Sequence, residues 1–131
     1  IVGYNENTIV GCGVYGDRIY TSKAADAIAG GIAGYNYKKI IACRSLPSTV
    51  QITRAAVNKF GVIAGECPKT AVIDRCNWSH DNLPAVASWG YTEENEQPES
   101  YGVAEMNQAI SEYNTGRDRN SNRYCALTWV E

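Results

Sequence analysis

Cysteine content is the feature that most constrains this chain. Five cysteines occur among 131 residues, and no two of them form a Cys-x-x-Cys pair. They are Cys12, Cys43, Cys67, Cys76 and Cys125. Wide, irregular spacing is more typical of a disulfide framework in a secreted protein than of a zinc or thiol-redox site. Because five is odd, one thiol is free, bonded to a partner, or bonded to a group that is now absent. We expect a secreted, disulfide-stabilised protein.

Length and composition favour one globular domain over residues 1–131. A hydrophobic share of 44% and a charged share of 20% provide for a packed core and argue against disorder. No apolar run approaches the roughly 18 residues that a membrane-spanning helix needs, so we expect no membrane partner. The opening Ile1-Val2-Gly3-Tyr4 lacks a charged segment followed by an apolar one, and we interpret it as a mature terminus.

Charge is distributed unevenly although the net charge is only −2. Residues 1–60 carry seven Lys and Arg against three Asp and Glu, whereas residues 61–131 carry five against eleven. The acidic run at 93–99 is typical of a solvated loop. This balance argues against a wholly basic nucleic-acid binder but allows a local basic face.

Two helices are predicted from apolar spacing. The first covers about 21–34 and would end at Gly34. Its apolar face would comprise Ala25, Ile28, Ala29 and Ile32. The second covers about 102–114 and would end at Gly116. Its stripe would comprise Val103, Met106, Ile110 and Tyr113.

Short apolar or alternating runs predict strands in the rest of the chain. These runs are 8–10, 39–43, 49–53, 70–73 and 124–130, together with a hairpin of 54–57 and 60–64 about a turn at Asn58-Lys59. No internal repeat is evident along the chain. We therefore expect an α+β fold in which an antiparallel sheet is packed by the N-terminal helix and the second helix.

His80 is the single histidine, and it is the first catalytic candidate because a histidine near carboxylates can act in general acid–base catalysis. Glu66 and Arg54 complete a candidate set, with Arg75 as an alternative to Arg54. The spacing of Cys67, Cys76 and His80 matches no common zinc pattern, and no glycine-rich phosphate loop is present. We therefore expect no metal and no cofactor.

One modification and one binding surface are also predicted. The sequence Asn77-Trp78-Ser79 is an acceptor for N-glycosylation at Asn77. Cations and aromatic rings, the groups that bind RNA, gather around residues 35–39 and 117–124. The candidate binding residues are Tyr35, Tyr37, Lys38, Arg117, Arg119 and Arg123. The alternative is that these tyrosines pack in the interior and these arginines are simply solvated.

A family resemblance begins at Cys12-Gly13. It continues through the alanine-rich segment 20–29 to Tyr35-Asn36-Tyr37. These segments resemble the opening of guanyl-specific fungal ribonucleases, and still more the ribonuclease-like secreted effectors of plant-pathogenic fungi. The resemblance implies one alanine-rich helix and a bridge from Cys12 to Cys125. A second bridge would then come from Cys43, Cys67 and Cys76. No catalytic residue carries over, because the family's Tyr-Pro-His strand is missing.

Three functions follow as hypotheses. The first is a secreted effector or toxin that binds a host molecule, such as a protein or RNA, without catalysis. The second is a ribonuclease with an altered active site around His80. The third is a carbohydrate-binding or cell-wall protein that stacks sugars on Trp78, Trp89 and Tyr91.

Overall fold

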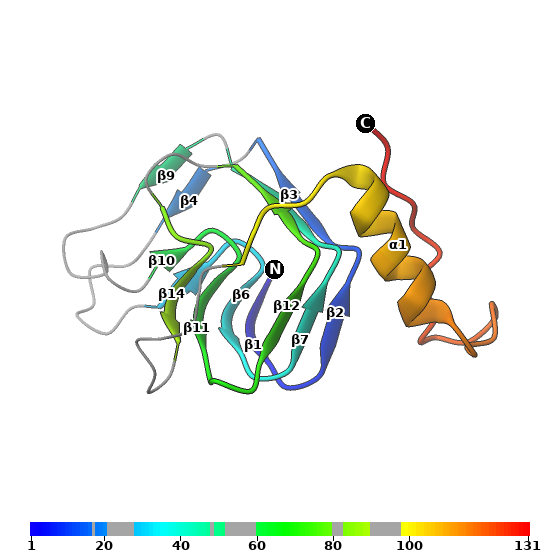
Figure 1. Ribbon diagram of the computed structural model, residues 1–131. Coiled ribbons are helices and arrows are strands. Elements are labelled where there is room, and N and C mark those ends of the chain that lie inside the picture. The colour runs from blue at the N-terminus through cyan, green and yellow to red at the C-terminus, as the bar shows by residue number, and fades with distance from the viewer. Residues whose placement is uncertain (17, 21–27, 48, 52–59, 80–82, 90–97) are drawn as a thin grey trace.

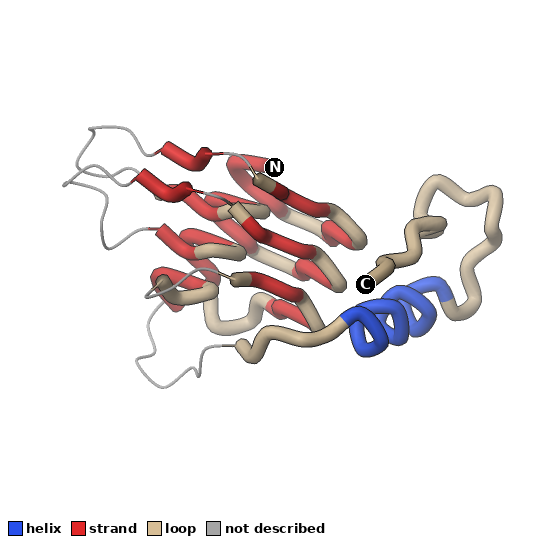
Figure 2. Tube along the Cα trace, turned by 90° about the horizontal axis from the view of Figure 1, so that it is seen from above, coloured by secondary structure: helices blue, strands red, loops and turns tan. Residues whose placement is uncertain are grey.

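Parallel strand pairing defines the architecture of the protein. The computed structural model describes residues 1–16, 18–20, 28–47, 49–51, 60–79, 83–89 and 98–131. Every strand pair within these residues is parallel. The chain winds as a β-solenoid, in which successive coils stack as layers and a helix lies beside the stack (Figures 1 and 2).

Equivalent strands of successive coils form five columns. The first column comprises β1 (Val2–Asn5), β6 (Ala33–Asn36), β11 (Ala64–Cys67) and β14 (Val86–Trp89). The second comprises β2 (Thr8–Val10), β7 (Lys39–Ile41) and β12 (Val72–Asp74). The third comprises β3 (Gly13–Tyr15), β8 (Arg44–Leu46) and β13 (Asn77–Trp78). The fourth pairs β4 (Arg18–Tyr20) with β9 (Thr49–Gln51), and the fifth pairs β5 (Ala29–Gly30) with β10 (Phe60–Gly61).

The strand register reveals a repeat of 31 residues. Val2 pairs with Ala33, and Thr8 with Lys39, at this same separation. In the first column, paired residues of the second and third coils are also 31 positions apart in the sequence. In the second and third columns this separation is 33. The repeat is visible in the sequence as Ile1-Val2-Gly3-Tyr4-Asn5, Ile32-Ala33-Gly34-Tyr35-Asn36 and Ile63-Ala64-Gly65-Glu66-Cys67. The expectation of no internal repeat is therefore wrong.

The predicted helix over 21–34 is also wrong in its described part. Residues 21–27, which include Ala25, lie outside the described residues, and from there the chain forms β5 and β6. The two strands meet at a corner that needs glycine, because a Cβ on Gly30 would lie 2.0 Å from the carbonyl oxygen of Ala33. Ile28 and Ile32 are four residues apart, as on one face of a helix, but here they lie on either side of this corner. Ile32 itself is buried in the solenoid interior.

The predicted antiparallel sheet is wrong, because the described strands pair in parallel columns. Strands expected at 8–10, 39–43, 49–53 and 70–73 occur as β2, β7, β9 and β12, but each pairs with the adjacent coil. The predicted hairpin is wrong because β10 and β11 belong to different columns, while residues 52–59 lie outside the described part. Residues 124–130 form no strand.

The core lies inside the coils and rests on apolar packing. Its largest buried side chains include Ile32, Ile40, Ile63 and Phe60. All five cysteines are free thiols, so the expected disulfide-stabilised fold is wrong. Three of them, Cys43, Cys67 and Cys76, instead fill the interior as small apolar side chains.

The second helix is confirmed as α1 (Val103–Asn114). Met106, Ala109 and Ile110 are buried against Ile41 and Ala42 of the solenoid. Val103 and Tyr113 pack at the margin of this cluster, as the predicted stripe requires. Among the described residues, no helix has the length and apolar character to cross a membrane.

Arg75 joins the helix to the solenoid electrostatically. Its guanidinium bonds to Asp74 at 2.8 Å and also to Glu112 of α1. The hydrogen bond from Arg75 lowers the pKa of Glu112. A lowered folded-state pKa gives stability above the unfolded-state value of about 4.3, and this stability is lost as pH falls through the folded-state value.

We expect Glu112→Gln to lower the melting temperature at neutral pH, by a difference that narrows as the pH falls from 7 to 3. Acid protonates Glu112 in the wild type and removes the ionised pair, so the two melting curves should draw together. Thermal unfolding across this pH range measures the difference. In an Arg75→Gln background, Glu112→Gln should change nothing at either pH. A constant difference at all pH values would contradict the ion-pair explanation.

Candidate binding surface

Three tyrosines form a surface cluster on the first strand column, which we call the tyrosine row. Its members are Tyr4, Tyr35 and Tyr37. The Tyr4 ring centroid lies 4.8 Å from that of Tyr37 and 5.8 Å from that of Tyr35. The Tyr35 and Tyr37 centroids are 6.1 Å apart. Tyr4 is 53% exposed and Tyr37 is 39% exposed, so the row presents a broad aromatic face to solvent.

The backbone register places these rings together. Tyr4 of β1 is directly paired with Tyr35 of β6. Alternation along a strand then turns the next residues, Asn5 and Asn36, into the interior, where both are buried. The Asn5 amide donates to Asn36 Oδ1 at 2.8 Å and to the Lys39 carbonyl at 3.1 Å. This internal asparagine pair fixes the strands that carry the rings.

Charged residues of both signs neighbour the row in the strand register or in the sequence. The pKa of Tyr4 is raised above its usual value, mainly by a hydrogen bond with Tyr37 and to a smaller extent by burial. Tyr4 is therefore protonated at neutral pH. Glu66 follows Tyr35 in register on β11, and the Glu6 carboxylate acts electrostatically on Tyr4. Lys38 is exposed beside Tyr37.

The predicted basic and aromatic residues occupy two parts of the molecule. Tyr35, Tyr37 and Lys38 lie at the end of β6, on the solenoid wall. Residues 117–123 follow α1, on the other side of the second column (Figure 1). There the Arg117 guanidinium lies 4.1 Å from the Tyr113 ring centroid and bonds to the Tyr113 carbonyl. Arg117 thus belongs to the helix end rather than to the tyrosine row, whereas Arg123 lines a cavity of about 500 Å³ together with Ile1 and Val2.

The catalytic candidates are placed only in part. His80 and Arg54 lie outside the described residues. Glu66 is paired with Tyr35 on one side and Ser88 on the other. Arg75, the alternative cation, is bonded to carboxylates as described above. Among the described residues, the strand neighbours of Glu66 are thus Tyr35 and Ser88. These residues do not define a catalytic set.

The remaining candidates have structural partners. The Asn77 amide donates to the Tyr101 carbonyl at 2.7 Å, and its oxygen accepts from Arg44 Nε at 3.0 Å. Glycosylation at Asn77 stays a prediction. A glycan would replace one of the two protons on the Asn77 amide nitrogen, which donates the hydrogen bond to Tyr101. Trp78 is half-buried against the core, Trp89 ends β14, and Tyr91 is outside the described residues.

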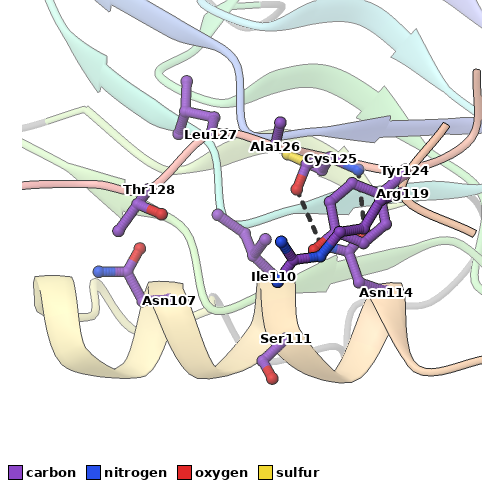
Figure 3. Close-up of a pocket in the computed structure, with 10 residues that line it drawn as sticks. All are labelled: Asn107, Ile110, Ser111, Asn114, Arg119, Tyr124, Cys125, Ala126, Leu127 and Thr128. Carbon is purple, nitrogen blue, oxygen red and sulfur yellow. Dashed lines mark hydrogen bonds between the residues drawn. The ribbon is translucent and has the colours of Figure 1, made fainter. Parts of the chain in front are cut away.

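A cavity of about 460 Å³ lies between α1 and the C-terminal segment (Figure 3). Asn114 of α1 bonds to both the N–H and the C=O of Cys125, at 2.9 and 2.8 Å. Asn107, two turns earlier, bonds in the same way to Trp129 at 2.8 and 2.9 Å. The asparagines that line this cavity therefore hold the C-terminal segment in place. This use of their polar groups makes the tyrosine row the better candidate for binding a ligand.

Within the part of the chain that the structure describes, no group of three or more His, Cys, Asp or Glu residues could hold a metal ion. Comparison with protein-family models, curated proteins and solved structures gave no match. Tyr4 was missed as a site residue, although the 31-residue repeat places it beside Tyr35.

Proposed function

We propose that this chain is a non-catalytic binding protein whose tyrosine row binds a polysaccharide. The observation that supports the proposal is the exposed, mutually packed cluster of Tyr4, Tyr35 and Tyr37 on a hydrogen-bonded solenoid wall. A tyrosine offers a flat apolar face and a polar hydroxyl, which suits a ligand with apolar and hydroxylated parts. The rings are held in place before binding, so little conformational entropy is lost.

Charge favours a neutral sugar over RNA at this surface. The Glu6 and Glu66 carboxylates flank the row and would repel a phosphate backbone. Carboxylates are strong acceptors for sugar hydroxyl groups. Arg117, whose guanidinium could bind phosphate, lies instead on the Tyr113 ring at the end of α1.

The wider biological role is part of the same proposal. We propose a secreted protein of effector or toxin type, for which the resemblance around Cys12-Gly13 is the support. The polysaccharide would then belong to a host or to a cell wall. A ribonuclease remains the alternative, with His80 and Arg54 as its decisive residues. The exposed tyrosine row supports binding more directly than the described surroundings of Glu66 support catalysis.

The proposal predicts that Tyr4→Ala/Tyr37→Ala abolishes retention on polysaccharide. The wild-type protein is incubated with cellulose, chitin, xylan and β-glucan, and bound protein is quantified against concentration. Losing both rings should weaken the affinity at least tenfold, because truncating an aromatic anchor commonly costs more than about 1 kcal/mol.

Tyr15→Ala is the matched control, since Tyr15 is 49% exposed on β3, away from the row. It should bind as the wild type does. Equal binding by the double variant would contradict the assignment of the surface. Binding of single-stranded RNA, with no polysaccharide retained, would contradict the assignment of the ligand.

A further inference from the structure

Three cysteines stack inside the solenoid at equivalent positions of successive coils. Cys12, Cys43 and Cys76 are separated by 31 and 33 residues, which match the strand register of the third column. The Cys12 N–H donates to Cys43 Sγ at 3.4 Å, and the Cys43 N–H donates to Cys76 Sγ at 3.3 Å. The sulfurs of Cys43 and Cys76 therefore each reach toward the preceding coil.

The spacing of the coils suits a disulfide between neighbours in this column. Gly13 and Arg44, which directly follow Cys12 and Cys43, are register partners. Adjacent strands lie about 4.8 Å apart, and disulfide-bonded residues have Cα atoms about 4.4–6.8 Å apart. The column thus needs little backbone movement to close a bond.

We infer that Cys12 and Cys43 are an oxidisable pair that forms a disulfide between the first and second coils. Cys12 is the half-buried member of the column, whereas Cys43 is fully buried and Cys76 is 1% exposed. A small disulfide oxidant therefore reaches Cys12 first.

The reaction balances as two thiol–disulfide exchanges. The Cys12 thiolate attacks the oxidant's disulfide, forms a mixed disulfide and releases one oxidant thiol. The Cys43 thiolate then attacks the Cys12 sulfur, forms the Cys12–Cys43 bond and releases the second. Two protein thiols are oxidised, one oxidant disulfide is reduced to two thiols, and the two protons pass to the departing thiolates.

Cys125, the partner implied by the family resemblance, belongs to a different part of the core. Cys12 packs against the solenoid interior, whereas Cys125 packs with α1 and Trp129. Gly11 lies against Cys125, since a Cβ on Gly11 would be 2.8 Å from Cys125 Sγ. Cys12 and Cys125 also line one cavity. The pairing within the column is favoured by the direct contact of the Cys12 N–H with Cys43 Sγ and by the strand register.

Thiol protonation sets the rate of this reaction. The pKa of the Cys12 thiol is raised, first by its hydrogen bond with Cys43 and then by burial. The pKa of Cys43 is raised to about 12, because a lowering by its hydrogen bond with Cys12 is outweighed by the hydrogen bond with Cys76 and by burial. Exchange should be slow at pH 7 and accelerate as pH rises.

The test is to incubate the folded, reduced full chain with oxidised glutathione at pH 8.5 and digest it with trypsin under non-reducing conditions. The five cysteines fall on five different tryptic peptides. We expect a linked product of peptides 1–18 and 40–44, and a fall from five titratable thiols to three. The melting temperature should rise by several degrees, because the bond restricts the unfolded chain.

Two variants keep the test decisive. Cys125→Ser should still form the linked product, whereas Cys12→Ser should leave all four remaining thiols unlinked. Both changes are at half-buried residues and spare the buried interior. A peptide linking Cys12 to Cys125, a peptide linking Cys43 to Cys76 as the main product, or five thiols surviving in the wild type would each overturn the inference.

Discussion

Gly61→Ala should destabilise the protein by about 3 kcal/mol or more, or prevent it from folding. A Cβ at this position would lie 1.8 Å from the Ala64 carbonyl oxygen and 2.7 Å from that of Ala85. Both atoms belong to the backbone, so no side chain can move aside. Overpacking a core costs about 1–3 kcal/mol when side chains can adjust, and more when they cannot. Urea unfolding followed by circular dichroism gives the free energy.

Gly3→Ala is the control for this prediction. A Cβ on Gly3 meets nothing within 4 Å. The change should therefore be neutral or should stabilise by about 0.4–1 kcal/mol, through the reduced entropy of the unfolded chain. If Gly61→Ala unfolded at the same urea concentration as Gly3→Ala, the close packing of β10 against β11 and β14 would be incorrect.

Trp129→Ala should cost about 3–5 kcal/mol, as for other buried aromatic residues. Trp129 is 9% exposed and joins three parts of the fold. Its Nε1 donates to the Ala42 carbonyl at 2.7 Å, its ring lies 5.2 Å from the Arg44 guanidinium carbon, and its backbone is held by Asn107. Removing the indole should release the C-terminal segment from both the solenoid and α1.

Trp129→Phe separates packing from hydrogen bonding. It retains most of the apolar ring but leaves the Ala42 carbonyl without the indole donor, so we expect a loss of about 1–3 kcal/mol. Chemical denaturation of the two variants measures both values. Equal losses for Phe and Ala would assign the effect to the hydrogen bond, and no loss for Ala would contradict the seating of the C-terminal segment.

Local signals predicted α1 but could not predict the solenoid. The helix depends on a stripe within twelve residues, from Val103 to Asn114. The solenoid depends on pairing between residues 31 apart, and its strands are only two to four residues long. Strands this short carry little alternation, and their pairing direction is set by the coil rather than by a turn.

The repeat was the signal that could have corrected the prediction. Few positions recur, and the offset changes from 31 to 33 within the third coil. Cys12 and Cys43 are separated by 31 residues, the length of the repeat. These cysteines, interpreted from the sequence as part of a disulfide framework, occupy equivalent interior positions of successive coils. Glycine spacing carried the same information, because Gly30 and Gly61 are register-equivalent corners. Comparing the chain with itself would have placed Tyr4 beside Tyr35.

The most direct test of the central claim is an amide chemical-shift titration with a soluble oligosaccharide of the retained polysaccharide. We expect the largest shifts to cluster at Tyr4, Tyr35, Tyr37 and their strand neighbours on β1 and β6. We also expect Tyr4→Ala/Tyr37→Ala to abolish these shifts. Shifts concentrated instead at residues 107–128, around the cavity beside α1, would contradict the claim that the tyrosine row is the binding surface.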